Sequence, residues 1–278
     1  MKILNYVDGS VYTQNILKII GDYKQNDIFL IHIVPQGCHS DRENTDYSLT
    51  LDLDSRNKLL EKLVNIDAQR SKIYNERAHI ILEHAAEHLK THFEIKAETI
   101  LERGDFSDIL SHHAQDKDLL IVGKQREGEA GRNVTSYLET IIRSAQKPIL
   151  AVSDYYTPFK QAVFAFDGSV RNQRALDFLE KHHFATLTDI HILVVDNHSS
   201  DIIAQAEDAQ RRLNEQNYQT VLTFKEGRVA PTIEDYIVYT KSDLLIAGAY
   251  GHSQVRHFFV GSTTDRLLKA VKTSILLF

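Results

Sequence analysis

The chain has 278 residues, of which 42% are hydrophobic and 25% charged, and its net charge is −6. This composition is typical of a globular protein of one large or two ordinary domains, and the negative charge argues against a nucleic-acid-binding protein or one that docks on an anionic membrane. Its single cysteine, Cys38, rules out an intrachain disulfide and fits a reducing, cytoplasmic location. We expect neither a signal peptide nor a membrane helix, since no apolar run approaches the ~20 residues that a membrane helix needs.

The sequence contains two copies of one unit. Asp-Gly-Ser-Val occurs at residues 8–11 and again at 167–170, each time after a short apolar run and at an offset of 159 residues. Three more pairs of similar segments follow in the same order, and they begin at Asp27 and Asp189, at Asp118 and Asp243, and at Ser136 and Ser262. Four collinear matches predict a tandem repeat. We place the first copy at 1–153, a short connector at 154–160 and the second copy at 161–278.

The first copy carries an insertion after its second predicted strand. We expect the acidic stretch 40–54 to form a loop and a long helix to follow it. Apolar residues keep helical spacing through this segment: Leu59, Leu63, Ile66, Ile73, Ala78, Ile81, Leu82, Ala85 and Leu89. We interpret the helix as a cover for the sheet or for the other copy, and a partner-binding face is the alternative.

In the second copy, apolar runs alternate with helical patterns. The expected strands are 161–166, 190–195, 219–225, 244–247 and 274–278, and the expected helices are 172–182, 200–216, 232–239 and 262–271. This alternation indicates an α/β fold with a parallel sheet and helices on both faces. The runs are nearly all apolar, as expected of strands buried on both faces, and the segment 219–225 alternates.

A glycine-rich loop joins the predicted strand 244–247 to the predicted helix 262–271. Its pattern is G-x2-G-x9-G-[ST], formed by Gly248, Gly251, Gly261 and Ser262, with Thr263 next. Glycines let the backbone approach a ligand closely. Free amide groups and the dipole at a helix start attract anions, so the loop is a candidate phosphate-binding site.

This loop follows a Leu-Leu-Ile strand, and an aspartate ends the first strand of the copy. Together these features resemble the universal stress protein (UspA) family, over almost the whole chain and as a tandem pair of domains. The insertion helix also resembles that of tandem members. The resemblance implies two tandem five-stranded parallel-sheet domains that are Rossmann-like, or adenine-nucleotide alpha-hydrolase-like. It also implies ATP or AMP binding in some members and none in others.

Carried over residue by residue, the resemblance implies a nucleotide site in the second copy. Asp167 would contact the adenosine, and the backbone of Val194 would meet the adenine. Ala247 and Gly248 would lie near the ribose and phosphates. The residues implied to hold the phosphates are Gly251, His252, Gly261, Ser262 and Thr263. The expected ligand is ATP, with or without Mg²⁺, and no residue is assigned a catalytic or metal-ligating role.

The first copy departs from this pattern. Gly123 aligns with Gly248, but Arg126 stands in place of Gly251 and Thr135 in place of Gly261, and the loop is one residue shorter. Side chains would fill space that the loop backbone should leave open. We therefore expect the first copy not to bind ATP in the manner of the family.

Other motifs predict ordinary structure. His84, His88 and His92 are four residues apart on the predicted insertion helix, but the glutamate of a metalloprotease motif is missing, so a solvated helix face is the simpler interpretation. The sequence contains neither a Gly-x-Ser-x-Gly hydrolase motif nor a Walker loop.

Three functions remain open from the sequence. The favoured one is a regulatory or stress-related module that binds nucleotide and has at most slow hydrolysis. The alternatives are a weak ATPase and a scaffold that recruits partners. We also expect the strands 149–152 and 275–278 to pair within the chain as a pseudo-dimer, and further homodimerisation is left open.

Overall fold

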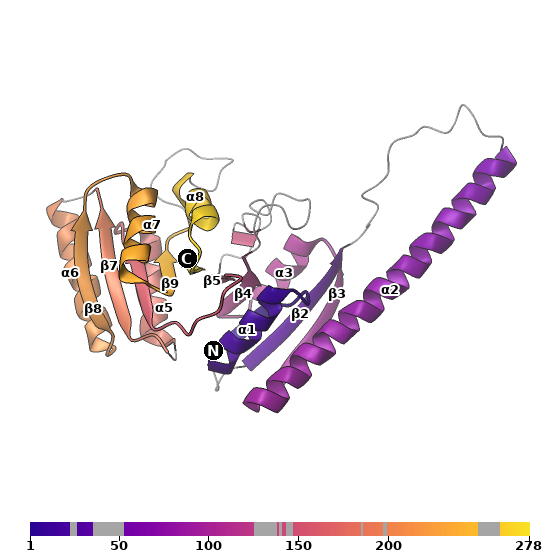
Figure 1. The fold of residues 1–278 in the computed structure, drawn as a ribbon, viewed down its shortest axis with the longest axis horizontal. Coiled ribbons are helices and arrows are strands. Elements are labelled where there is room, and N and C mark those ends of the chain that lie inside the picture. Colours follow the sequence, from indigo (N-terminus) through magenta and orange to yellow (C-terminus); the bar gives the residue numbers. More distant parts are fainter. Residues whose placement is uncertain are drawn as a thin grey trace.

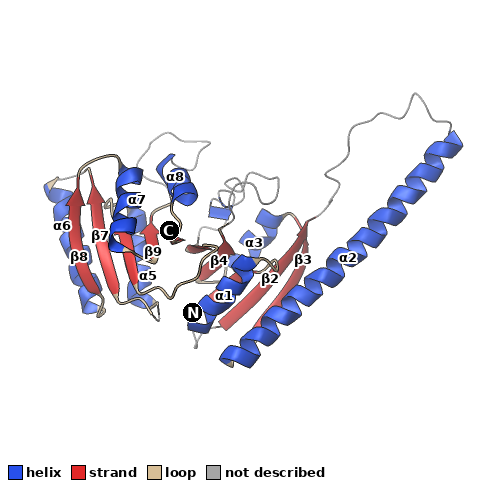
Figure 2. Ribbon diagram, in the orientation of Figure 1, coloured by secondary structure: helices blue, strands red, loops and turns tan. Residues whose placement is uncertain are grey.

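The computed structural model describes residues 1–22, 27–35, 53–124, 138, 141–142, 147–184, 186–196, 199–249 and 262–278. Within these, the side chains of residues 35, 53–61, 63, 67 and 262–265 are not described. The described residues form three layers, in which helices cover both faces of one ten-stranded sheet (Figures 1 and 2). The fold is α/β, as the sequence predicts, and among the described residues no helix has the length and apolar character needed to cross a membrane.

The N-terminal half of the sheet is built from consecutive β–α units. Its elements are β1 (Lys2–Tyr6), α1 (Val11–Asp22), β2 (Asp27–Pro35), α2 (Leu53–Phe93), β3 (Ala97–Gly104), α3 (Phe106–Ala114), β4 (Leu119–Gly123) and β5 (Ile149–Val152). These strands pair in parallel in the order β3-β2-β1-β4-β5.

The C-terminal half repeats this order. Its elements are β6 (Gln161–Ala165), α5 (Val170–Lys181), β7 (Asp189–Val195), α6 (Ser200–Glu215), β8 (Gln219–Lys225), α7 (Val229–Thr240), β9 (Leu244–Ala247), α8 (Ser262–Ala270) and β10 (Ser274–Leu277). Its strands are parallel in the order β8-β7-β6-β9-β10. Every element predicted in the second copy is present, with ends that differ by at most three residues. Two five-stranded parallel units therefore lie in tandem.

The two halves join through their last strands. β5 and β10 are antiparallel, and Leu150 stands opposite Leu276. The amide of Ser153 also donates a hydrogen bond of 3.1 Å to Oγ of Ser274, and Nζ of Lys124 bonds the carbonyl of Val271. The predicted pairing of these strands within one chain is confirmed. It relates the halves by a pseudo-twofold axis and buries two strands that would otherwise be sheet edges.

The buried side chains fall into two clusters, one on each face of the sheet. One cluster joins strand residues to α1, α2, α5 and α6, and the other joins them to α3, α7 and α8. Both clusters run through both halves. Alternation along a strand assigns neighbours to opposite faces, so Leu276 belongs to the first cluster while Ile275 and Leu277 belong to the second.

The repeated Asp-Leu-Leu-Ile segments have a structural role. The carboxylate of Asp118 accepts a hydrogen bond of 2.8 Å from the amide of Lys2, at the start of β1. In the other half, Asp243 accepts one of 3.1 Å from the amide of Lys160, just before β6. Each aspartate fixes the start of the neighbouring strand, and Asp243 thereby also anchors the end of the connector.

The long helix α2 covers the sheet with only part of its length. Ala78, Leu82, Ala85 and Leu89 are buried against it, as predicted. Ile73 is 62% exposed and Ile66 45% exposed, so the expectation that they also cover the sheet is wrong.

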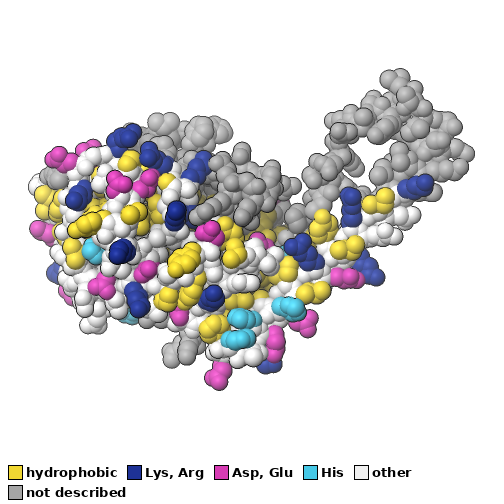
Figure 3. Space-filling view, in the orientation of Figure 1, with side chains coloured by type: hydrophobic (Ala, Val, Ile, Leu, Met, Phe, Trp, Pro, Cys, Tyr) yellow, Lys and Arg dark blue, Asp and Glu magenta, His cyan; other side chains and the backbone are white. Residues whose placement is uncertain are grey.

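The reason is length. A helix of 41 residues spans about 60 Å, whereas the longest strand beneath it has nine residues and spans about 30 Å. α2 therefore runs past the sheet (Figure 1). Its extended part shows hydrophobic and basic side chains together on the visible face (Figure 3).

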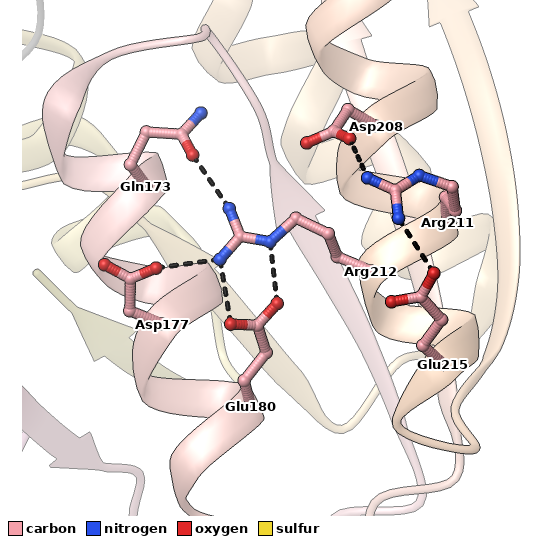
Figure 4. A network of polar contacts seen from close by, with 7 residues as sticks. All are labelled: Gln173, Asp177, Glu180, Asp208, Arg211, Arg212 and Glu215. Carbon is pink, nitrogen blue, oxygen red and sulfur yellow. Dashed lines mark hydrogen bonds and ion pairs between the residues drawn. The ribbon is translucent and has the colours of Figure 1, made fainter.

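A polar clamp holds α5 against α6 (Figure 4). The guanidinium of Arg212 donates to both carboxylate oxygens of Glu180, at 2.6 and 2.9 Å, and to Asp177 at 2.8 Å and Gln173 at 3.1 Å. These bonds lower the pKa of Glu180 and raise that of Arg212. A bidentate pair of this kind fixes the relative orientation of the two side chains in addition to pairing their charges. It therefore holds α5 in place against α6.

Candidate functional site

A cavity of about 220 Å³ opens at the carboxyl ends of β6, β7 and β9. Its walls are Ala165, Phe166, Asp167, Leu193, Val195, Val229, Ile233, Ala247, Gly248 and Leu267. Three residues predicted for the nucleotide site, Asp167, Ala247 and Gly248, meet here. The carboxyl ends of parallel strands are where open α/β sheets bind their ligands, so the cavity is the candidate site.

The Asp-Gly-Ser turn shapes one side of the cavity. Oδ1 of Asp167 accepts the amide of Ser169 at 2.9 Å, and the amide of Asp167 donates to Oδ1 of Asn172 at 2.6 Å. Asn172 is fully buried and also donates to the carbonyl of Ala165. Ser169 caps α5. These bonds hold the Asp167 carboxylate, which is exposed, at the mouth of the cavity.

Glycine is required within this turn. Gly168 has a φ of +72°, and a Cβ there would lie 2.6 Å from Oε1 of Gln205 and 2.8 Å from Cδ1 of Ile202. Both neighbours lie on α6. A side chain at residue 168 would therefore strain the backbone and push α6 away from the turn.

Val194 does not line the cavity. Its side chain is 1% exposed and packs in the cluster that includes α5 and α6, whereas its neighbours Leu193 and Val195 face the cavity. Alternation along β7 explains this, because successive side chains point to opposite faces. The expected contact of Val194 concerned its backbone, and that contact stays a prediction.

The rest of the predicted phosphate loop cannot be placed. Gly251, His252 and Gly261 lie outside the described residues, as do Arg126 and Thr135 of the first copy. Ser262 and Thr263 lie in the first turn of α8, and their side chains are not described. The helix nevertheless begins at Ser262, as predicted, so free amide groups of its first turn follow the loop.

Sequence reasoning missed Arg171. A Cβ built on Gly248 would lie 3.3 Å from Cβ of Arg171, so this arginine stands directly beside the glycine that starts the loop. The offset of 159 residues makes Tyr12 its counterpart, and Tyr12 stands over Gly123 in the same way, at 2.6 Å. The repeat alignment could have singled out this position, where one copy has a buried tyrosine and the other a cation.

The corresponding place in the N-terminal half contains aromatic side chains. Tyr6 corresponds to the cavity residue Ala165 by the same offset, and Phe106, the first residue of α3, corresponds to Val229, the first residue of α7. The rings of Tyr6 and Phe106 meet edge to face, with centroids 4.8 Å apart. Burial, followed by the nearby Asp8, raises the pKa of Tyr6 above its usual range. These rings add bulk where the C-terminal half has two small side chains and a cavity.

The Asp-Gly-Ser turn itself is similar in the N-terminal half. Asp8 accepts the amide of Ser10 at 2.9 Å and the hydroxyl of Thr13 at 3.0 Å, and Gly9 has a φ of +80°. This repeated turn therefore starts a helix in both halves, whether or not a cavity lies beside it.

The histidines of α2 form no metal site with other described residues. The rings of His88 and His92 stack with centroids 4.2 Å apart, and burial, then His92 and Lys18, lowers the pKa of His88. Within the described ranges, no group of three or more His, Cys, Asp or Glu side chains is placed to hold a metal ion.

Comparison with known proteins agrees with this geometry. Residues 158–278 match the universal stress protein family. The chain is 28% identical over 244 residues to Universal stress protein Slr1230 of Synechocystis, a match that covers 85% of this chain and 84% of that protein.

Solved structures share the fold over the full length. A universal stress protein of Archaeoglobus fulgidus superposes with a TM-score of 0.71 and 17% identity, covering 99% of this chain and 97% of that one. A functionally unknown protein of Pseudomonas aeruginosa gives a TM-score of 0.58 and 14% identity, with 100% and 92% of the two chains covered. Fold, sequence match and the residues at the strand ends agree: residues 158–278 match the universal stress protein family, and the chain as a whole is similar in sequence and fold to universal stress proteins.

Proposed function

We propose that the C-terminal half binds an adenine nucleotide, with the nucleoside in the 220 Å³ cavity. The observation that carries this proposal is the meeting of Asp167, Ala247 and Gly248 at one cavity, on the loop side of the sheet. The cavity is smaller than the ~300–1,000 Å³ usual for complete ligands. Its size therefore favours the nucleoside end of the ligand over a whole nucleotide.

The wall chemistry supports this orientation. Apolar side chains from β7, α7 and α8, among them Leu193, Ile233 and Leu267, offer a dry surface for a base. The exposed carboxylate of Asp167 at the mouth can accept a hydrogen bond from a ribose hydroxyl. The phosphates of the bound nucleotide would extend from the cavity past Gly248 and lie near Arg171 and the start of α8. The cation and the helix dipole both favour anions there.

The proposed ligand is ATP, with or without Mg²⁺, and the proposed role is regulation during stress rather than turnover. Asp167 is the one carboxylate among the described residues that line the cavity, and its Oδ1 already accepts a hydrogen bond within the turn. The two tandem domains, which are joined by the connector at residues 154–160, then have different functions. The single cysteine of the sequence supports a cytoplasmic location.

A cavity-filling substitution tests the proposal. Ala165→Tyr places in the C-terminal half the residue that its counterpart Tyr6 provides in the N-terminal half. Titration calorimetry with ATP and Mg²⁺ should show about one site per wild-type chain and at least tenfold weaker binding to the variant. Val238→Tyr, on a side chain that is 76% exposed, is the matched control and should bind as the wild type does.

Two results would contradict the proposal. One is no binding of ATP, ADP, AMP or adenosine to wild-type protein that is free of co-purified nucleotide, which would favour the scaffold hypothesis. The other is unchanged binding by Ala165→Tyr with an unchanged melting temperature, which would place the nucleotide elsewhere.

A further inference from the structure

A second, larger cavity lies where the two halves meet. Its volume is about 730 Å³, within the range of small-molecule sites. We call it the seam cleft, and its lining residues are Lys117, Asp118, Ile142, Lys147, Pro148, Ile149, Arg171, Arg174, Asp177, Phe178, Lys181, His182, Ala249, Leu277 and Phe278. It shares none of these with the nucleoside cavity.

One face of α5 forms the wall of the seam cleft that the C-terminal half contributes. Arg171, Arg174, Phe178 and Lys181 are spaced by three, four and three residues, which places them along a single helix face. The facing residues precede β4 and begin β5, in the N-terminal half. The Arg212 clamp fixes α5 through Glu180 and Asp177, and Asp177 itself lies at the edge of the cleft, so the helix face that carries these cations is held in place.

The charges of the seam cleft do not cancel. Both of its side-chain carboxylates are engaged elsewhere, because Asp118 accepts the amide of Lys2 and Asp177 pairs with Arg212. Lys117 pairs with Asp116. By contrast, Lys147, Arg174 and Lys181 form no ion pair with any residue in the described part of the chain. Among the described residues that line the cleft, five lysine and arginine side chains outnumber the two aspartates, in a chain whose net charge is −6.

The floor of the seam cleft is apolar and aromatic. The rings of Phe178 and Phe278 meet at a centroid distance of 5.4 Å, and His182 lies 5.0 Å from Phe178. Burial is the main cause that lowers the pKa of His182, and it disfavours the charged form of this ring. Ile149 and Leu277, paired across the seam, complete the floor. Cations at the rim and rings at the floor match a ligand with an anionic and a flat apolar end.

We propose that the seam cleft binds a small phosphate-bearing molecule with an aromatic part, at a site separate from the nucleoside cavity. Lys147 from one half and Arg174 and Lys181 from the other contact the phosphate, and Phe178 and Phe278 contact the ring. The ligand touches both halves, so its binding stabilises their β5–β10 junction.

Phenyl phosphate is a suitable probe, with phenol and inorganic phosphate as its two separate parts. Calorimetry on the full chain should show tighter binding of phenyl phosphate than of either part, and a rise in the melting temperature with probe concentration. Arg174→Gln combined with Lys181→Gln should weaken binding at least tenfold, since two charge-assisted contacts are lost. Both side chains are exposed, so the variant should fold. Arg211→Gln, which removes an exposed arginine from α6, is the control and should bind normally.

Adenosine separates this site from the nucleoside cavity, because it carries no phosphate. Adenosine affinity should be the same in the double variant as in the wild type, and adenosine should not displace phenyl phosphate. Competition between adenosine and phenyl phosphate would mean one continuous site and overturn the proposal. Equal binding of the probe to the double variant and the wild type would also overturn it, as would no binding by the wild type at millimolar concentration.

Discussion

The two halves of this protein have one topology and two different sites. Both have the strand order 3-2-1-4-5 and an Asp-Gly-Ser turn that starts a helix. They differ at the strand ends, where Tyr6 and Phe106 in one half correspond to Ala165 and Val229 in the other. The fold depends on a pattern of buried strands that tolerates such changes. The space at the strand ends depends on the volume of a few side chains, so it can differ between the two copies while the fold stays the same.

The strongest test of the shared fold compares Leu89 of α2 with Leu213 of α6, which are both fully buried on the same face of the sheet. Replacing either leucine by alanine should lower the free energy of unfolding by about 2–5 kcal/mol, because each change leaves a cavity. Denaturant unfolding monitored by circular dichroism measures the loss. A loss below 1 kcal/mol at Leu89 would mean that α2 is not part of the core.

The loop-starting glycines should respond differently to alanine. At Gly123 a Cβ would lie 2.6 Å from Cβ of Tyr12, which cannot move without shifting α1, so Gly123→Ala should cost about 1–3 kcal/mol. At Gly248 the nearest atom is 3.3 Å away, and Gly248→Ala should have a smaller effect on stability. Melting curves of the two variants provide the comparison. Equal losses would contradict the difference we infer between the two turns.

The clamp between α5 and α6 should be sensitive to acid. Arg212→Ala should destabilise the protein by about 1–2 kcal/mol at pH 7, since it leaves Glu180 and Asp177 without their partner. The pKa of Glu180 is lowered in the folded state. Its contribution is therefore present above its unfolded pKa and disappears as the pH falls through the folded value.

The stability difference between wild type and Arg212→Ala should accordingly shrink as the pH falls below about 4, the region of an ordinary glutamate pKa. Arg211→Ala, on a side chain that is 61% exposed, is the neighbouring control and should change stability little at any pH. If the difference in the free energy of unfolding between the wild type and Arg212→Ala stays constant until acid unfolds the protein, the role of this ion pair is contradicted.

The smallest effect is expected on the uncovered part of α2. Ile73 is 62% exposed, so Ile73→Ser should change the free energy of unfolding by no more than about 0.5 kcal/mol. Denaturant unfolding of Ile73→Ser and of Leu89→Ala compares the two positions within one helix. A loss above 1 kcal/mol would show that Ile73 is covered in solution.

The sequence alone determined the repeat and the order of strands and helices along the second copy, because apolar runs and turn residues are local patterns along the chain. The meeting of Asp167, Ala247 and Gly248 was implied by the family resemblance that the glycine spacing carries. The pairing of the two final strands within the chain could also be predicted, since an apolar last strand needs a cover, and the structure shows that it is antiparallel.

Only the tertiary structure decided which side chains meet across the fold. The sequence did not show that Ile73 lies beyond the sheet while Leu89 is buried, because that depends on the strand lengths beneath α2. The face of β7 on which Val194 lies was not predicted either, although Asp189 and His191 alternate with apolar neighbours at the start of the strand and mark its two faces. The contact of Tyr6 with Phe106, the position of Arg171 beside Gly248 and the seam cleft likewise join residues far apart in the chain. Packing of the complete sheet brings them together, and no local pattern records it.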